Sequence, residues 1–424
     1  MLKDFLRYVL LNVFSMLGIS VYVLCDTYFI ANGIGTNALS GLNLVLPYFS
    51  LITAIGLMIG MGTATRFSIL CGAKRQEEAA YILIHGLFLA VIFSLIVSAC
   101  GYIYTDKICL AMGADEILFP YAKDYIGTIF LFSWAIIINN LAVCITRATG
   151  HPRLAMIAAL VGSGSNLLMD VLFIYGLKMG NYGAALASGV SPLFGLALQI
   201  YYFAAIEKKY EFKPCKIKLR KLIDICCLGF PSFITEVATG FVMACFNFAI
   251  LRLAGNIGIA AYSIIANVAI VVGAMFTGVA QGIQPLISFN YGARNYCAVK
   301  QVSHYAYVTI AAMSVFEYIL FYACSTDIIN AFNKDNNLEL ISMADIGIKV
   351  YFTSLIFMGA NIVMTSILSS TAKPGRSFIL SICRAGVIVI PVLLLLSKYF
   401  GITGVWATIP VAEFLTLLLG IFQL

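Results

Sequence analysis

The stretch "GIGTNALSG" at residues 33–41 has a partner in "AGNIGIAAYS" at residues 254–263. Aligning the two matches Gly35 with Gly255, an offset of 220 residues. Three further pairs match at offsets of 220 to 222 residues: Gly72 with Gly292, Pro152 with Pro374, and Gly183 with Gly404. One coincidence would carry little weight, but four in order along the chain indicate an internal repeat. The chain therefore consists of two similar halves.

The composition is that of a membrane protein. Of the 424 residues, 62% are hydrophobic and only 11% are charged, and the mean hydropathy is +0.98. Soluble chains carry about 25% charged residues. Apolar segments long enough to cross a hydrocarbon core of about 30 Å recur along the whole chain. They predict twelve membrane spans, at residues 5–32, 41–70, 79–104, 121–147, 153–177, 182–206, 222–252, 259–290, 299–324, 346–371, 377–400 and 402–423.

These spans should be α-helices, because the alternation of apolar and polar residues that marks a membrane β-barrel is absent. Six spans precede the basic segment 207–221 and six follow it. Six crossings return the chain to its starting side, so both halves begin on the same side of the membrane. We predict an all-α polytopic membrane protein with two parallel-repeat six-helix lobes, 1–206 and 222–424, joined by the linker 207–221.

The basic residues mark one side of the membrane. Most of the 26 Lys and Arg fall in loops on the side of the N-terminus, including the cluster "EKKYEFKPCKIKLRK" at 207–221. Positive loops face the cytoplasm, so we expect a cytoplasmic N-terminus in a multi-pass protein of the cell (inner or plasma) membrane. The cluster is interpreted as a solvated linker near anionic lipid, with a lipid-sensing site as the alternative. The net charge of +7 therefore indicates no nucleic-acid partner.

Of the 19 Asp and Glu, 14 fall in loops or at span ends, and five lie well inside predicted spans: Asp26, Asp170, Glu236, Glu317 and Glu413. A carboxylate at the centre of a membrane helix costs about 2.5 to 3.5 kcal/mol on insertion scales. Such acids need water, partners or protons, and they commonly mark ion and substrate pathways. They are the first candidates for a functional site.

Asp26 and Asp170 are both predicted in the outward halves of their spans. Asn166 precedes Asp170 by four residues and so lies on the same helix face one turn away. With Asn140 and Ser188 these residues could form one polar pocket inside the N-terminal lobe. Oxygen ligands of this kind suit Na⁺, a hard cation, at Asp26, Asn166 and Asp170, or a shared proton. For Asn140, Asn166 and Ser188, hydrogen bonding between helices or a structural role is the alternative.

The second lobe offers a different set. Glu236 follows Pro231, and an ionisable residue beside a Pro-interrupted helix is a pointer to a binding site. Arg384 and Glu413 should lie at similar depth on antiparallel neighbours, so we interpret them as a structural ion pair. Glu317, nearer the outer end of its span, is expected to reach interfacial water.

These residues resemble the multidrug and toxic compound extrusion (MATE) transporters. The resemblance spans the whole chain and both halves. In the first helix and the start of the second, the family pattern reads Asp26, Thr27, Gly33, Gly35, Ala38, Leu39 and Pro47. The fifth-helix pattern reads Asn166 and Asp170, and the seventh-helix pattern reads Pro231 and Glu236. One departure is that "YFTSLIFMGANIVMTSILSST" at 351–371 lacks the acid that some members carry on helix ten. We therefore expect the cation site in the N-terminal lobe rather than in the C-terminal lobe.

The resemblance implies a V-shaped pair of lobes that exports bulky, often cationic, drugs in exchange for inward Na⁺ or H⁺. Carried over by position, Asp26, Asn140, Asn166, Asp170 and Ser188 would form the cation-coupling network. Lipophilic cations would be held by acid charge and aromatic ring faces. The candidate substrate-binding residues are Asp26, Tyr22, Glu236, Tyr28, Tyr48, Phe233 and Phe241. The expected partners are small-molecule drugs, organic cations and membrane lipid, around a monomeric protein.

Two other classes stay open. A lipid-linked oligosaccharide flippase of the same superfamily would share the paired lobes, but its cavity should be more basic in order to hold pyrophosphate. An intramembrane aspartyl protease would also need two membrane carboxylates, but the Gly-x-Gly-Asp signature is missing before Asp170. We therefore predict no catalytic residues and no enzyme. The twelve cysteines lack paired spacing, and no cofactor is expected beyond the coupling ion.

Overall fold

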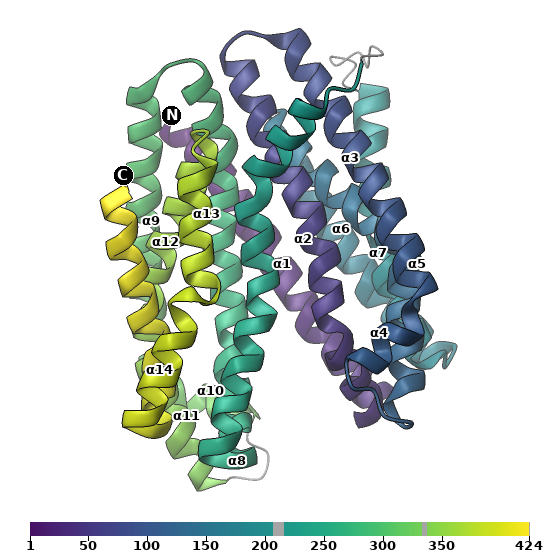
Figure 1. Ribbon diagram of the computed structural model, residues 1–424, viewed down its shortest axis with the longest axis vertical. Coiled ribbons are helices and arrows are strands. Elements are labelled where there is room, and N and C mark those ends of the chain that lie inside the picture. Colours follow the sequence, from purple (N-terminus) through teal and green to yellow (C-terminus); the bar gives the residue numbers. More distant parts are fainter. Residues whose placement is uncertain (207–215, 333–336, 424) are drawn as a thin grey trace.

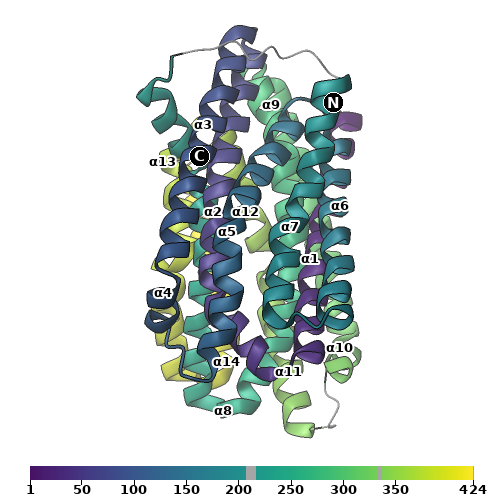
Figure 2. The same cartoon turned by 90° about the vertical axis from the view of Figure 1, so that its right-hand side faces the viewer.

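The computed structural model describes residues 1–206, 216–332 and 337–423, and every regular element within them is helical. Figure 1 shows two bundles that lie close together at the upper end, where the N-terminus is found, and diverge toward the lower end. Figure 2, turned by 90°, shows that the helices run along the long axis of the molecule.

The first bundle contains α1 (Leu2–Gly33), α2 (Thr36–Gly72), α3 (Gln76–Ile103), α4 (Thr105–Ala111), α5 (Leu118–Ala148), α6 (Pro152–Asp170), the π-helical turn η1 (Val171–Gly176), α7 (Gly180–Tyr201) and η2 (Tyr202–Ile206). The second contains α8 (Leu219–Gly292), α9 (Tyr296–Ala323), α10 (Ser325–Phe332), α11 (Leu338–Tyr351), η3 (Phe352–Ser354), α12 (Leu355–Ser370), α13 (Pro374–Ile382), η4 (Cys383–Val387) and α14 (Val389–Gln423). We call them the N-terminal and C-terminal bundles.

The helices account for the predicted spans. Ten helical stretches of the described chain are long and apolar enough to cross a membrane, and two of these, Leu219–Gly292 and Pro374–Phe422, have 74 and 49 residues. Each of the two turns at a glycine with left-handed φ, Gly255 at 58° and Gly401 at 59°, and so contains two crossings. The described residues thus contain twelve spans, and the prediction of an all-α polytopic membrane protein is confirmed.

The backbone repeats with the sequence. Left-handed φ angles recur at matching positions of the two halves: Gly35 (122°) with Gly255 (58°), Lys74 (61°) with Arg294 (58°), Gly150 (98°) with Ala372 (54°), and Gly180 (61°) with Gly401 (59°). Residues in this region commonly end a helix and redirect the chain. The two halves therefore use the same helix-to-helix turns at the same spacing.

Each bundle has its own hydrophobic core, and each core includes the upper end of a helix from the other bundle. Ile225 of α8 belongs to the core of the N-terminal bundle. Phe5 and Val9 of α1 belong to the core of the C-terminal bundle. Since α1 and α8 are matching helices of the repeat, the exchange is symmetric. The division into lobes 1–206 and 222–424 stays a proposal, and residues 207–215 of the predicted linker lie outside the described chain.

The upper ends meet through glycines. A Cβ atom on Gly72 of α2 would lie 1.9 Å from the Phe289 carbonyl oxygen, and one on Gly292 of α8 would lie 1.9 Å from the Ile69 carbonyl oxygen. Ile69 and Phe289 are themselves 220 residues apart, so the contact is two-fold symmetric. No side chain larger than hydrogen fits where backbones approach this closely.

The same pattern recurs at Gly62, nearly three turns before Gly72 on α2. A Cβ on Gly62 would lie 2.0 Å from the Ile225 carbonyl oxygen, and one on Gly229 would lie 1.8 Å from that of Met58. We call Gly62, Gly72, Gly229 and Gly292 the glycine seam. It brings the backbones of the two bundles into direct contact.

The seam predicts a strong size limit. We expect Gly229→Val to force the upper ends apart, because its side chain would overlap backbone rather than a movable side chain. Gly240→Val on the same helix is the matched control, since a Cβ there meets nothing within 4 Å. The measurement is the distance between spin labels at the exposed turn residues Lys74 and Arg294, in a background without native cysteines. An unchanged distance in Gly229→Val would contradict the seam as the closing contact.

Candidate functional site

The two acids predicted in the N-terminal bundle lie together in its lower half. Asp26 is on α1 with 8% of its surface exposed, and Asp170 is fully buried as the last residue of α6, where the π-helical turn η1 begins. Their side chains are within hydrogen-bonding reach of one another. Two carboxyl groups at this distance cannot both stay charged without a proton or a cation between them.

Asn166 and Ser188 complete this pocket. The Asn166 amide is fully buried between Asp170 and α7. With its nitrogen turned toward Asp170 it donates to Oδ2 over 3.1 Å, and its oxygen then accepts from the Ser188 backbone N–H over 3.3 Å. Asn166 and Asp170 therefore lie on the same helix face and are in contact, as their four-residue spacing predicts.

The pocket has spare oxygen atoms. Oδ1 of Asp26 and Oδ1 of Asp170 are buried and accept no hydrogen bond from any described residue. Buried polar atoms are nearly always bonded in proteins, and an orphan oxygen at a carboxyl pair calls for a ligand. Carboxylate, amide and hydroxyl oxygens are the donor set that hard cations prefer, and the same pair could hold a proton. The residues present therefore fit either Na⁺ or a shared proton as a ligand of the pocket.

Two tyrosines line the same place. The hydroxyl of Tyr125 on α5 lies within hydrogen-bonding reach of the Ser188 side chain. Half-buried Tyr22, one turn before Asp26 on α1, lies near both acids. Tyr22 was predicted as a substrate-binding residue, whereas Tyr125 was missed.

Asn140 does not join the pocket. Its amide lies against Gly56 of α2, where a Cβ would come within 2.9 Å of its Nδ2 atom. On α5, Asn140 is fifteen residues beyond Tyr125, which is about 22 Å along a helix. A count of depth along this helix, which runs from the lower end upward, would have excluded Asn140 and pointed to Tyr125. The expectation that Asn140 belongs to the cation-coupling network is therefore corrected.

The predicted substrate aromatics separate into two kinds. Tyr28 and Phe241 are exposed, at 62% and 57%. Tyr48 packs edge-on against Phe130, with ring centroids 6.1 Å apart, and is half-buried at the N-terminal core. Phe233 is stacked on Phe230 at 5.5 Å and also packs against that core. Tyr28 packs edge-on against its neighbour Phe29, but it and Phe241 keep most of their surface exposed, whereas the other two rings are packed against the core.

Glu236 lies on α8 two turns below the seam. Its carboxylate is half-buried and forms no hydrogen bond or ion pair with the described residues. α8 is helical on both sides of Pro231, so the interruption expected from the sequence is absent there. The neighbouring Thr235 hydroxyl donates to the carbonyl oxygen of Pro231 over 2.9 Å. Glu236 is thus an unpaired acid in the C-terminal bundle.

Arg384 and Glu413 are in contact. Nε of Arg384 donates to both carboxylate oxygens of Glu413 over 3.0 Å, and Nη2 donates to Oε1 over 2.9 Å. Asn361 donates to Oε2 of Glu413 over 2.7 Å and to its carbonyl oxygen over 2.8 Å. This bonding satisfies a carboxylate in a way that the Asp26 and Asp170 pocket does not.

Glu317 was expected to reach interfacial water, but its side chain is buried. It is 4% exposed, and neither of its carboxylate oxygens has a hydrogen-bond partner among the described residues. Ser314, one turn before it, is also buried with an unpartnered hydroxyl. Phe316, the residue directly before Glu317, is instead 67% exposed. The rotation of α9 turns Glu317 inward, and depth along the helix alone could not reveal that rotation.

Sequence reasoning also missed Arg147, which lies at the end of a predicted span and was counted with the loops. It is 3% exposed at the upper end of α5. Its guanidinium donates to Oδ1 of Asn12 on α1 over 2.8 Å and to Oε1 of Gln281 on α8. Nearby, Nε2 of Gln284 donates to the Met61 carbonyl oxygen over 3.0 Å. A buried charge bonded to both bundles therefore adds polar contacts to the glycine seam.

The chain matches a known family over most of its length. The family model MatE matches residues 12–172 and 231–395. The multidrug export protein MepA of Staphylococcus haemolyticus is 28% identical over 410 residues, which cover 95% of this chain and 88% of that protein. MepA of Staphylococcus aureus is 27% identical over 398 residues, 93% of this chain and 86% of that protein.

Solved structures show the same fold. An outward-facing multidrug resistance transporter of the MATE family superposes with a TM-score of 0.94 at 21% identity, covering 99% of this chain and 94% of the other. A transporter of the same superfamily from Pyrococcus furiosus, described as having a binding pocket of reverse polarity, superposes with a TM-score of 0.93 at 21% identity and the same coverage.

The buried acids of the C-terminal bundle predict stability changes of opposite sign. We expect Glu317→Leu to raise the thermal unfolding temperature, because it removes a buried polar group without partners, worth about 1–3 kcal/mol. We expect Glu413→Leu to lower it, because Arg384 would be left buried and unpaired at a cost of about 3–5 kcal/mol. Both are measured on purified protein in detergent. Destabilisation by Glu317→Leu would show that Glu317 has a partner which this arrangement lacks.

Proposed function

The chain belongs to the MATE family, and from this premise we propose that it is a secondary active exporter of lipophilic, often cationic, compounds, driven by inward movement of Na⁺ or H⁺. The observation that carries the proposal is the buried pair Asp26 and Asp170, whose spare oxygens lie inside a membrane-spanning bundle. The curated relatives are named multidrug export proteins, which supports the class of substrate.

Ion binding at this pair would act through charge. With the pair empty, two carboxylates in contact repel one another and α1 is pushed from α6; a proton or Na⁺ removes that repulsion. The upper end of α1 is held in the other core by Phe5 and Val9. A shift of the lower half of α1 is therefore transmitted toward the contact between the bundles. Ion and drug need only favour different arrangements of the bundles for their movements to be coupled.

Closing the lower ends and opening the upper ends would require the seam to part. In that step the Arg147 bonds to Asn12 and Gln281 would break, and each of these groups would need water in place of its partner. The position of this polar cluster at the upper end, which we assign to the cytoplasm, allows water to enter as the ends separate. Alternating access is thus consistent with the contacts present.

The substrate would lie between the lower halves of the bundles. Asp26, whose pair with Asp170 has no cation beside it in the described chain, and the unpaired Glu236 would offer negative charge from the two sides. The exposed rings of Tyr28 and Phe241 would offer faces for a lipophilic cation. This distribution disfavours the flippase alternative, since pyrophosphate would meet acids. The carboxyl contact itself resembles an aspartyl protease dyad, but membership of a transporter family favours ion coupling. We further propose a monomer in the cell membrane with a cytoplasmic N-terminus.

Removing either acid should uncouple transport. We expect Asp26→Asn and Asp170→Asn each to reduce ion-driven accumulation of a fluorescent organic cation in proteoliposomes by about 5- to 150-fold, the range of ordinary coupling free energies. The assay imposes a Na⁺ gradient or a pH gradient separately, which also identifies the ion. Asp115→Asn is the matched control, because Asp115 only caps the start of α5 by accepting from the Ile117 and Leu118 backbone N–H groups, a role that Asn can keep.

The outcomes separate the hypotheses. Full gradient-driven export by both variants would remove this pocket as the coupling site. Absence of cation export by the wild type, together with movement of a lipid-linked pyrophosphate, would establish the flippase instead.

A further inference from the structure

A groove runs between α8 and α14 of the C-terminal bundle. It encloses about 460 Å³ and is lined by the apolar side chains of Ala244 and Phe248 on α8 and of Ile390 and Leu394 on α14. Figure 1 shows α14 beside α8 in the lower half of this bundle. Both segments belong to the membrane-spanning stretches, and we infer that the open side of the groove faces lipid.

Two cations stand at one end of the groove. Arg252 on α8 lines it, with its guanidinium carbon 4.2 Å above the centre of the Phe248 ring. Lys398 on α14 also lines it, and its Nζ atom is 5.9 Å from the centre of the Tyr399 ring. Both side chains are exposed, and neither forms an ion pair with an acid in the described parts of the chain. Two positive charges therefore lie at the same end of the groove, without an acidic counter-ion among the described residues.

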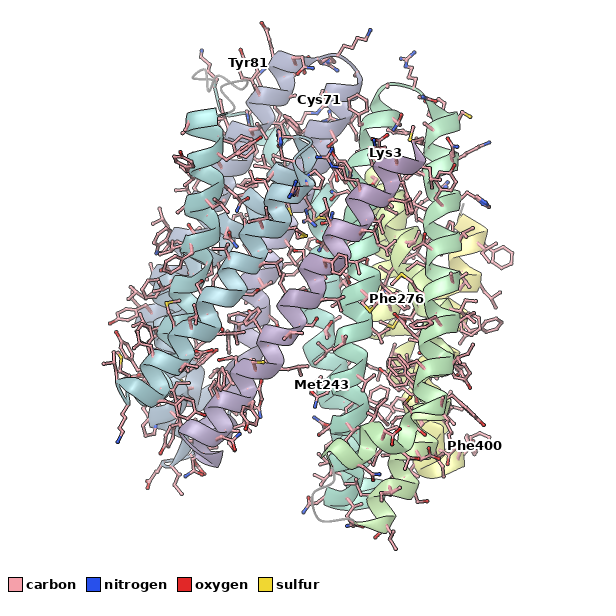
Figure 3. All side chains as sticks on the ribbon, turned by 180° about the vertical axis from the view of Figure 1, so that it is seen from behind. Lys3, Cys71, Tyr81, Met243, Phe276 and Phe400 are labelled. Atoms are coloured by element: carbon pink, nitrogen blue, oxygen red, sulfur yellow. The ribbon has the colours of Figure 1, made fainter. Side chains whose placement is uncertain are left out.

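This end of the groove is at the membrane interface. Arg252 is three residues before Gly255 and Lys398 is three before Gly401, the two glycines at which α8 and α14 turn back. Figure 3 shows Phe400, two residues after Lys398, at the lower end of the molecule. Long basic side chains near a span end place their charge at the level of lipid headgroups.

We propose that this groove binds an anionic phospholipid. The phosphate would lie between Arg252 and Lys398, and an acyl chain would extend along Phe248, Ile390 and Leu394. The charges match a phosphate and repel the cationic compounds proposed as substrates, so the groove is distinct from the transport pathway. The matching positions in the N-terminal half are Asn32 and Leu177, which carry no charge, so we infer one such site per chain.

The test is a titration of the purified full chain with phosphatidylglycerol, followed by native mass spectrometry. Each basic residue near an anionic lipid surface contributes about fivefold in affinity, so Arg252→Gln and Lys398→Gln should each weaken binding about fivefold and the double variant about thirtyfold. Lys107→Gln is the matched control: this exposed lysine also stands over an aromatic ring, Tyr104 at 5.4 Å, but does not line the groove. The Lys107→Gln variant should bind phosphatidylglycerol as tightly as the wild type does.

Two further arms separate lipid from other ligands. Ala249→Phe should weaken phosphatidylglycerol binding without changing charge, because it fills the groove. Glycerol 1-phosphate, which lacks acyl chains, should not compete at the same concentration. Equal binding of phosphatidylcholine and phosphatidylglycerol, or unchanged binding by the double variant, would overturn the proposal. Neither result would bear on ion coupling by Asp26 and Asp170, so the two proposals fail separately.

Discussion

The close approach of α2 and α8 is the constraint on which the rest of this architecture depends. At Gly72 and Gly292 the two backbones leave no room for a Cβ atom, and the contact repeats under the internal symmetry. Because the upper ends of α1 and α8 also pack into opposite cores, the bundles cannot separate there without exposing apolar side chains such as Phe5 and Ile225. The lower ends carry no such glycine contact among the described residues, and they diverge (Figure 1). A molecule held at one end and open at the other has the geometry that alternating access requires.

The two halves repeat the backbone arrangement but not the buried acids. The position of Asp26 in the second half is Phe246, which is fully buried and stacked on Tyr262 with ring centroids 5.5 Å apart. Tyr262 in turn stacks on Trp406. An aromatic stack therefore fills in one bundle the volume that a carboxyl pair occupies in the other. The two bundles are similar in backbone, and among the described residues only the N-terminal one has a pair of acids without a cation at that depth.

Sequence patterns were sufficient for the features that depend on period and spacing. The spans followed from apolar length, the two halves from matched glycines, and the contact of Asn166 with Asp170 from a four-residue interval. Features that depend on helix rotation and relative depth were beyond the sequence. Glu317 and Phe316 are adjacent in the chain, but only the packing of α9 shows which one is buried. Arg147 lay at a span end, where a basic residue is ordinary, and only the meeting of α1, α5 and α8 makes it a buried bond between bundles.

The contrast between the two sets of buried charges explains how one fold can be both stable and switchable. Glu413 accepts hydrogen bonds from Arg384 and Asn361 within its own bundle. Its charge therefore stays balanced when one bundle moves relative to the other. Asp26 and Asp170 have no cation beside them in the described chain, and each keeps one buried oxygen without a partner. In the proposed mechanism their charge balance is completed from outside the protein, by an ion whose presence changes the repulsion between α1 and α6. An acid pair without a protein counter-ion is therefore the part of the structure on which we propose that an ion gradient acts.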